Sequence, residues 1–231
     1  MVHACRSRLV GALLALTLWG CEGAPVENRF LPLGEGRTWR YKVTPRRMFD
    51  GDELVLEVTN LKARELKGRY VTPVRYELDG RPSIQFLGVD DQGVYRWAVQ
   101  APEDAPPKFE SDSAYYLMYP LKLGKSWEEE AETAFLPKPV HLTIKSKIEK
   151  TGETVSVPAG DFTDCVKVRT EGSKRIPVPG SYSRFGIVSI QYDTWYAPDV
   201  GMVKSEAEEL DNGASGFTSL SLRTELESYE P

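Results

Sequence analysis

Apolar and polar residues alternate with a period of two along most of the chain beyond residue 50. Four runs show the pattern, at 53–58, 141–145, 188–196 and 219–226. Such alternation is typical of strands that bury one face. Clusters of Gly, Pro, Asp and Asn separate the runs and predict tight turns. We predict about ten to twelve strands and one short helical turn from Ser113 to Tyr119.

This pattern predicts a mainly β protein with little helix. The expected architecture is a curved antiparallel sheet, or a sandwich or half-barrel, built from two related β units. The chain of 231 residues is long enough for a sizeable core.

The two units are inferred from a motif that occurs twice, 88 residues apart (Pro32 to Pro120). Each copy combines proline, leucine, glycine, a base, a hydroxyl residue and tryptophan. The motif residues are Pro32, Gly36 and Trp39 in the first copy and Pro120, Gly124 and Trp127 in the second.

Two shorter similarities follow in the same order, 83–86 with 189–192 and 91–94 with 199–202. We therefore predict a first unit at 30–112 and a second at 113–231, joined near 101–107 or merged into one continuous domain.

The motif has a structural explanation. Proline ends a preceding strand and glycine allows a turn with positive φ. Tryptophan then buries a large ring over the core. Carbohydrate stacking by Trp39 and Trp127 is the alternative, but we expect both rings to be mostly buried.

The first 20 residues follow a different pattern. Arg6 and Arg8 precede an apolar run of about 11 residues, too short for a spanning helix of roughly 20. Basic, apolar and small residues in this order are typical of a secretory signal. With Gly20 before Cys21, the segment resembles a bacterial lipoprotein signal with its lipobox.

This resemblance implies a signal peptide at 1–20, a lipid on Cys21 and a tether at 21–29 that joins the folded part to the membrane. Glu22 in place of aspartate favours the outer membrane over the inner one under the sorting rule of such lipoproteins. An ordinary signal peptide with a chance cysteine is the alternative.

The net charge argues against one class of function, and the cysteine content indicates the role of Cys165. Without Arg6 and Arg8, the 29 bases become 27 against 34 acids, a net charge of −7. An acidic chain does not suit non-specific nucleic-acid binding. If Cys21 carries lipid, Cys165 has no intramolecular partner, and its strand-like surroundings predict a buried structural thiol.

Two stretches of the second half, 155–168 and 195–204, resemble a loose group of exported bacterial lipoproteins, mostly without assigned function. Pro158 and Gly160 mark a turn in the first stretch. In the second, Trp195 ends a strand and Gly201 turns the chain. The resemblance implies a curved sheet in a cell-envelope protein, loosely like carriers of lipoproteins and lipids.

A search for catalytic chemistry finds little. His141 is the one histidine beyond the signal segment, and no Gly-x-Ser-x-Gly elbow, phosphate loop or zinc ligand set occurs. The acids at 50–53 and 90–91 lack the spacing of a calcium loop. We expect the glutamates at 128–132 and 206–209 to be solvated strand faces or edge protection. We predict no catalytic residue, no metal and no cofactor.

The sequence therefore favours a non-enzymatic, lipid-anchored cell-envelope protein with a binding or scaffold role. One alternative is a carrier or sensor of an apolar ligand, such as an acyl chain, in the curved sheet. Another is a glycan-active enzyme with two carboxylates that folding brings together. The expected partners are the membrane through Cys21 and an apolar ligand or envelope protein, with no nucleic acid.

Overall fold

The computed structural model describes residues 26–46, 52–134, 136, 138–178, 180, 184–213 and 217–231. One short 3-10 helix, η1 (Val26–Phe30), precedes the strands. The strands are β1 (Thr38–Arg46), β2 (Leu54–Asn60), β3 (Arg64–Leu66), β4 (Arg69–Leu78), β5 (Arg81–Val89), β6 (Gly93–Gln100), β7 (Lys108–Met118), β8 (Ser126–Glu132), β9 (His141–Val157), β10 (Gly160–Pro177), β11 (Phe185–Ala197), β12 (Gly201–Asn212) and β13 (Phe217–Glu230).

The strands form one antiparallel sheet in the order β7-β6-β5-β4-β2-β1-β13-β12-β11-β10-β9-β8, and β3 pairs with β4 beside it. The mainly β fold class is confirmed. The described part of the chain has thirteen strands, slightly more than predicted. The short helical turn predicted from Ser113 to Tyr119 is wrong, because residues 108–118 belong to β7 and pair with β6.

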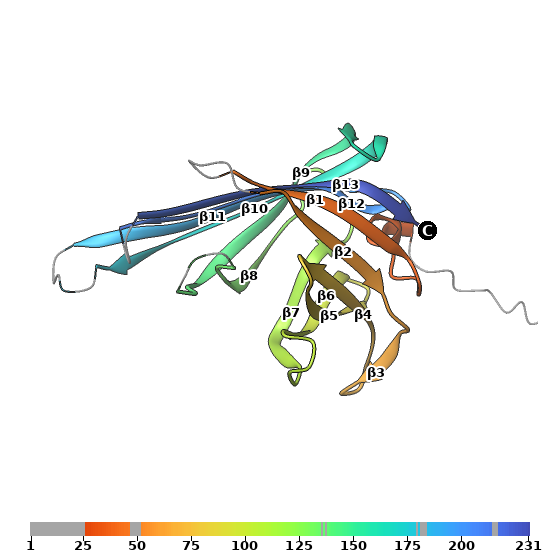
Figure 1. Ribbon diagram of the computed structural model, residues 1–231, viewed down its shortest axis with the longest axis horizontal. Helices are drawn as coiled ribbons and strands as arrows, with labels where there is room; N and C mark the ends of the chain where they lie inside the picture. The colour runs from red at the N-terminus through yellow and green to blue at the C-terminus, as the bar shows by residue number, and fades with distance from the viewer. Residues whose placement is uncertain are drawn as a thin grey trace, which may run out of the picture.

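The sheet is strongly curved and does not close, as the half-barrel alternative requires. In Figure 1 the strands β10 to β13 extend together as a long arm, while β2 and β4 to β7 curl away from them. The helix η1 lies at the same end of the molecule as the end of β13 (Figure 1).

Tight turns give the sheet its hairpins. Asp79 and Gly80 connect β4 to β5 with φ angles of 49° and 75°. A two-residue hairpin turn with φ above zero at both positions matches the twist of its strands, and Asp-Gly is a preferred pair for it. The Asp-Gly signal in the sequence therefore indicated a real turn.

The two ends of the sheet, β7 and β8, approach each other without a ladder in the described part of the chain. Two side chains of β8 bind the main chain of Tyr115 in β7 instead. The Trp127 indole N–H donates to the Tyr115 carbonyl oxygen (3.0 Å), and the Tyr115 N–H donates to Glu129 Oε2 (2.9 Å). We call this contact the β7–β8 seam.

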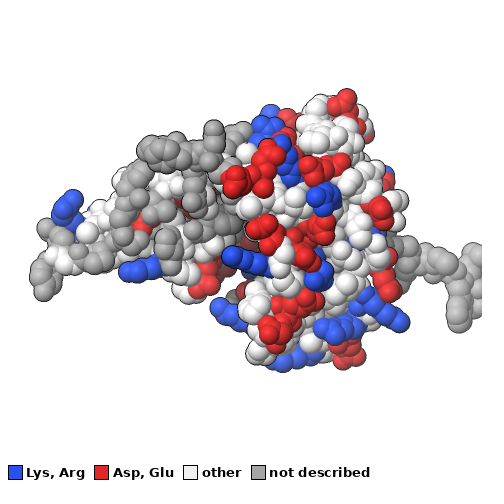
Figure 2. Space-filling model, in the orientation of Figure 1, with Lys and Arg blue, Asp and Glu red and all other residues white. Residues whose placement is uncertain are grey.

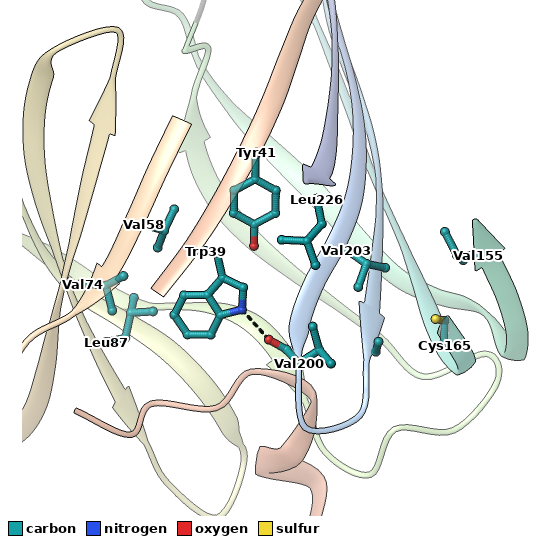
Figure 3. Close-up of a cluster of buried hydrophobic side chains, with 11 residues drawn as sticks. Trp39, Tyr41, Val58, Val74, Leu87, Val155, Cys165, Val200, Val203 and Leu226 are labelled. Carbon is teal, nitrogen blue, oxygen red and sulfur yellow. Dashed lines mark hydrogen bonds between the residues drawn. The ribbon is translucent and has the colours of Figure 1, made fainter. Parts of the chain in front are cut away.

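The largest buried cluster lies inside the curve, where β1, β2, β4 and β5 face the β11–β12 turn (Figure 3). Trp39 is 7% exposed and Tyr41 is 3% exposed. The Trp39 indole donates to the Val200 carbonyl oxygen (2.7 Å), and the Tyr41 hydroxyl donates to the Met202 carbonyl oxygen (2.9 Å). These bonds connect β1, across β13, to the β11–β12 turn and the start of β12.

The strand order contains two six-stranded meanders, β1-β2-β4-β5-β6-β7 and β8 to β13. Residues 119–125 separate them, whereas the predicted boundary at 112 lies inside β7 and the segment 101–107 joins β6 to β7. The two-unit organisation stays a prediction. If the two meanders are the units, the boundary between them lies at 119–125 instead of at 112.

The glycine of the repeated motif has the same local geometry in both copies. Gly36 and Gly124 have φ angles of 83° and 85°. The Gly36 N–H donates to the Asn60 carbonyl oxygen (2.9 Å), and the Gly124 N–H donates to that of Ile148 (2.9 Å). Trp127 is 7% exposed, like Trp39, so both rings are buried as expected.

The sequence similarity between residues 83–86 and 189–192 does not extend to the packing of these side chains. Ile84 of β5 packs with Phe86 on the face that β3 covers, and Gln85 points to the inner hollow described below. In β11 it is Ile190 that lies on the inner side, packed with Ile144. The matching residues thus occupy corresponding strands but opposite faces.

Candidate functional site

The inner space of the curved sheet contains a hollow of about 180 Å³. Its walls are mainly aromatic and aliphatic side chains from the segment before β1 and from both sides of the curve: Leu31, Pro32, Leu33, Trp39, Tyr41, Val58, Asn60, Val74, Tyr76, Gln85, Leu87, Tyr116, Tyr196 and Met202. Ligand pockets commonly measure about 300–1,000 Å³ and are mostly apolar with a few polar groups. The hollow has this character and a smaller volume.

The segment from residue 29 to residue 34, which we call the strap, forms one wall of the hollow. The Asn60 side-chain amide donates to the carbonyl oxygens of Pro32 and Gly34, both at 3.0 Å. The Thr72 hydroxyl donates to the Leu33 carbonyl oxygen (3.3 Å). These bonds satisfy strap carbonyls inside the curve, and they hold the Leu33 side chain against the cluster of buried residues.

The strap is also fixed at its start. The Arg29 guanidinium binds the Asp199 carboxylate through two hydrogen bonds, and the Asp199 N–H donates to the Arg29 carbonyl oxygen (2.7 Å). The Arg29 hydrogen bond lowers the pKa of the Asp199 carboxyl. Both side chains are well exposed, so this pair orients the strap more than it stabilises the fold.

Gly201 lies under the strap, in the β11–β12 turn, and its backbone conformation explains why a glycine occurs there. Its φ angle is 101°, a region that side chains rarely adopt. A Cβ at this position would lie 3.5 Å from Pro32 Cδ and 3.9 Å from the Trp39 indole nitrogen. The structure thus brings together three residues of the predicted motifs at the mouth of the hollow.

One end of the hollow is polar. Arg96 of β6 donates from Nε to Glu110 Oε1 of β7 (2.8 Å) and lies close to Tyr116. The Tyr116 hydroxyl in turn bonds the Gln85 amide oxygen. Burial lowers the pKa of Arg96, but Tyr116 and Glu110 outweigh it and raise the pKa above its ordinary value. Arg96 is therefore a permanent cation beside the hollow.

Glu129 faces this polar end from β8, across the β7–β8 seam. Burial raises the pKa of its carboxyl to about 7, although the Tyr115 N–H and the charge of Arg96 lower it. The nearby Glu110 adds to the rise. Titratable groups that combine burial with a specific charge partner are enriched at functional sites.

Sequence reasoning missed this polar end. We expected residues 128–132 to form a solvated strand face, and Glu128, Glu130 and Glu132 are exposed. Glu129 is the exception because alternate residues of β8 point inward. Period-two alternation could have separated it from its neighbours, but it gave no sign that β7 lies close enough to bury it.

A second acid of the expected solvated runs is fully buried. Glu209 of β12 is 0% exposed, and its Oε1 accepts the Ala134 N–H (2.7 Å) and the Tyr192 hydroxyl. It holds the connection between β8 and β9 onto the arm. These bonds explain Glu209 as a structural anchor, and we assign it no ligand.

The outer face of the sheet carries paired charges of both signs, and Figure 2 shows the interleaving of such charges over one side of the molecule. Lys167 is the most buried, with 9% of its side chain exposed, and it contacts Glu149 (2.7 Å) and Asp193 (3.3 Å). Burial raises the pKa of Asp193, but Arg169 and Lys167 outweigh it and lower the pKa below its ordinary value. The result is a closed network in which each charge has a partner.

Trp195, another residue of the predicted motifs, belongs to this outer network. Its ring lies between the ammonium groups of Lys167 (4.9 Å) and Lys204 (4.6 Å), and its indole donates to Glu153 Oε2 (3.0 Å). These contacts satisfy the ring and give Trp195 a packing role on the outside of the sheet.

A groove of about 390 Å³ lies beside this network on β8, β9 and β10. Its charged lining residues are three bases and two acids: Lys145, Lys147, Arg169, Glu149 and Glu171. Charges of both signs at this density do not select an anion or a cation. The groove is larger than the inner hollow but lacks its apolar walls.

The remaining predicted residues have structural surroundings. Pro158 lies in the turn between β9 and β10, which resumes at Gly160, and Pro120 lies in the connection between β7 and β8. Burial raises the pKa of the Cys165 thiol to about 11, and the residue is 0% exposed, as the alternation predicted. Cys21 lies outside the described residues.

No cluster of metal-ligating side chains occurs within the described ranges. Asp90 accepts the N–H groups of Gln92 and Gly93, both at 2.9 Å, so its carboxylate shapes a turn. Of the acids at 50–53, Asp50 falls outside the described residues. His141 is exposed and pairs with Glu132 (2.6 Å). No helix in the described part of the chain is long and apolar enough to cross a membrane.

The fold and site define a class of protein: an open, curved antiparallel sheet with an apolar hollow and a polar end. Residues 139–220 match the family described as DUF3108-like. This segment runs from the residues before β9 into β13 and contains both stretches, 155–168 and 195–204, that resemble exported lipoproteins. No curated protein matches the chain.

Two solved structures are similar to this chain. One is a predicted lipoprotein from Parabacteroides distasonis ATCC 8503, with 16% identity, a TM-score of 0.44 and coverage of 87% of this chain and 98% of that one. The other is a predicted exported protein with a YmcC-like fold from Bacteroides fragilis NCTC 9343, with 17% identity, a TM-score of 0.42 and coverage of 87% and 99%.

Proposed function

We propose that the mature chain is a lipid-anchored cell-envelope protein that binds an apolar group, such as part of an acyl chain, in the inner hollow. The observation that supports this most is the hollow itself. A pure scaffold would fill the inside of its sheet with side chains, whereas Tyr76, Tyr116 and Met202 line open space here. The carrier alternative therefore takes precedence over the scaffold.

The position of the strap supports a ligand from the membrane. The strap begins at Arg29, about eight residues after Cys21, and eight extended residues reach at most roughly 28 Å. With a lipid on Cys21, the hollow would lie close to the lipid surface. Attachment to the outer membrane, in preference to the inner, is part of the same proposal.

Binding without catalysis is the form that we propose. An acid-base enzyme would have to use Glu110 and Glu129, the two acids at the polar end. Glu110 is held by Arg96, and Glu129 accepts the Tyr115 main-chain N–H across the seam. Each carboxylate thus has a structural bond that proton transfer to a substrate would disturb.

The test is native mass spectrometry of the full chain carrying Cys21→Ser, purified from a bacterial envelope without detergent. We expect co-purified molecules with acyl chains. Met202→Trp should fill the hollow and reduce their amount several-fold. Met118→Trp is the matched control, because Met118 is partly buried in the neighbouring cluster and does not line the hollow.

An absence of bound lipid in the parent protein, or equal lipid content in Met202→Trp and Met118→Trp, would refute binding in the hollow. Hydrolysis of envelope glycans by the parent and its loss in Glu129→Gln would instead support the enzyme alternative.

A further inference from the structure

A connected set of polar groups leads from the wall of the hollow to a charged pair. Gln85 and Tyr116 line the hollow, and their side chains are hydrogen-bonded to each other. Tyr116 lies close to Arg96, which pairs with Glu110 (2.8 Å). We call Gln85, Arg96, Glu110 and Tyr116 the polar end. An amphiphile with its chain in the hollow would place its head group here.

The polar end is partly exposed to solvent. The side chains of Arg96 and Glu110 are each 30% exposed, whereas the apolar residues deeper in the hollow, such as Leu87 at 2%, are buried. The site therefore changes from apolar to partly hydrated over a short distance. This gradient suits a molecule with one apolar part and one polar part.

The charges of the polar end already balance. The Arg96 guanidinium is neutralised by the Glu110 carboxylate, and the facing Glu129 adds a partly protonated carboxyl at neutral pH, because burial raises its pKa to about 7. A ligand carboxylate or phosphate in this site would be repelled by Glu110 and Glu129, and the one base, Arg96, is already paired with Glu110. A ligand ammonium group would be repelled by Arg96.

Burial of an unpaired charge is costly, and so is the removal of a buried charge from its partner. An uncharged head group with hydroxyls avoids both costs. It can donate to Glu110 or to the Gln85 amide oxygen and accept from Arg96, and no existing ion pair has to break.

We propose that the polar end binds the uncharged, hydrogen-bonding head group of a single-chain amphiphile, of which a monoacylglycerol is the model compound. The proposal rests on the proposed function, because the acyl chain is expected to occupy the hollow. It adds a head-group class that the hollow alone does not determine.

The test compares three probes that share an eight-carbon chain: 1-octanoylglycerol, octanoate and octylammonium. Calorimetric titration of the full chain carrying Cys21→Ser at pH 7 should give the tightest binding for 1-octanoylglycerol. We expect a preference of about tenfold or more over each charged probe, since a factor of ten corresponds to one or two well-placed hydrogen bonds.

Gln85→Leu provides the second measurement, because it keeps the size of the side chain and removes its hydrogen bonds. It should weaken 1-octanoylglycerol about three- to tenfold and change the charged probes little. Gln191→Leu is the matched control, since Gln191 is exposed on β11.

The outcomes separate the two proposals. Equal affinities for the three probes, or tighter binding of octanoate, would overturn the head-group proposal and leave the hollow as a binding site. No binding of any probe would overturn the proposed function itself. Loss of affinity in both Gln85→Leu and Gln191→Leu would also contradict a specific role for the polar end.

Discussion

Replacement of Glu129 by glutamine should make the protein more stable, and increasingly so as the pH rises. The glutamine keeps an oxygen that can accept the Tyr115 N–H, and it removes a partly buried negative charge. Burial raises the pKa of this carboxyl from an ordinary 4.5 to about 7 in the folded protein. The folded state therefore binds the proton more tightly than the unfolded state does.

The sign of the pH dependence follows from this order of pKa values. Below about pH 4.5 the carboxyl is protonated in both states, and its contribution to stability is fully present. As the pH rises to 7, the unfolded state loses its proton first, so the folded state loses stability relative to it. The full difference corresponds to roughly 3 kcal/mol, and roughly 2 kcal/mol of it develops between pH 5 and pH 8.

The assay is urea unfolding of the full chain carrying Cys21→Ser, with and without Glu129→Gln, at several pH values from 5 to 8. Tryptophan fluorescence is a suitable signal, because the Trp127 indole lies in the same seam. The gain in unfolding free energy should grow by roughly 2 kcal/mol across this range. Glu128→Gln removes an equal charge from an exposed position and is the control.

A gain that is constant with pH would show that Glu129 titrates alike in the folded and unfolded states, which would refute the reasoning. A gain that shrinks as the pH rises would show that Arg96 or the Tyr115 N–H outweighs burial. Equal curves for Glu129→Gln and Glu128→Gln would assign the effect to net charge alone.

Three further predictions concern single residues. Trp39→Ala should lower the unfolding free energy by roughly 3–5 kcal/mol in urea titrations, because it removes a buried ring; wild-type stability would contradict its core role. The Cys165 thiol should react with a thiol reagent at pH 8 only after unfolding, since burial raises its pKa to about 11; rapid reaction in the folded protein would contradict this. Cys21→Ala should yield unlipidated and unprocessed protein in cell fractionation, and normal membrane retention would refute the anchor.

The sequence predicted the strands well because one physical rule, burial of alternate side chains, operates along each of them. The Asp-Gly turn at Asp79 and the buried thiol of Cys165 followed from local rules of the same kind. The segment from Ser113 to Tyr119 was misread because its polar start and aromatic end show no clear period. Its strand conformation depends on pairing with β6.

The polar end could not be predicted, because no local rule brings its residues together. Gln85, Arg96 and Tyr116 come from three strands, and Glu129 reaches them from the opposite end of the sheet. Each is unremarkable in its own segment. The curvature that places β8 next to β7 arises from the whole sheet, so the charge balance of the site is a long-range property.

With the proposed anchor at Cys21, the strap would be a mechanical link between the membrane and the interior of the protein. Tension applied at Cys21 would be transmitted along the chain to Arg29, and there the two bonds to Asp199 would bear it first. Beyond this clamp, the next groups under load are Pro32 and Leu33, which are part of the wall of the hollow. A pull at Cys21 would thus load the turn between β11 and β12 through Asp199 and, beyond this clamp, the wall of the hollow.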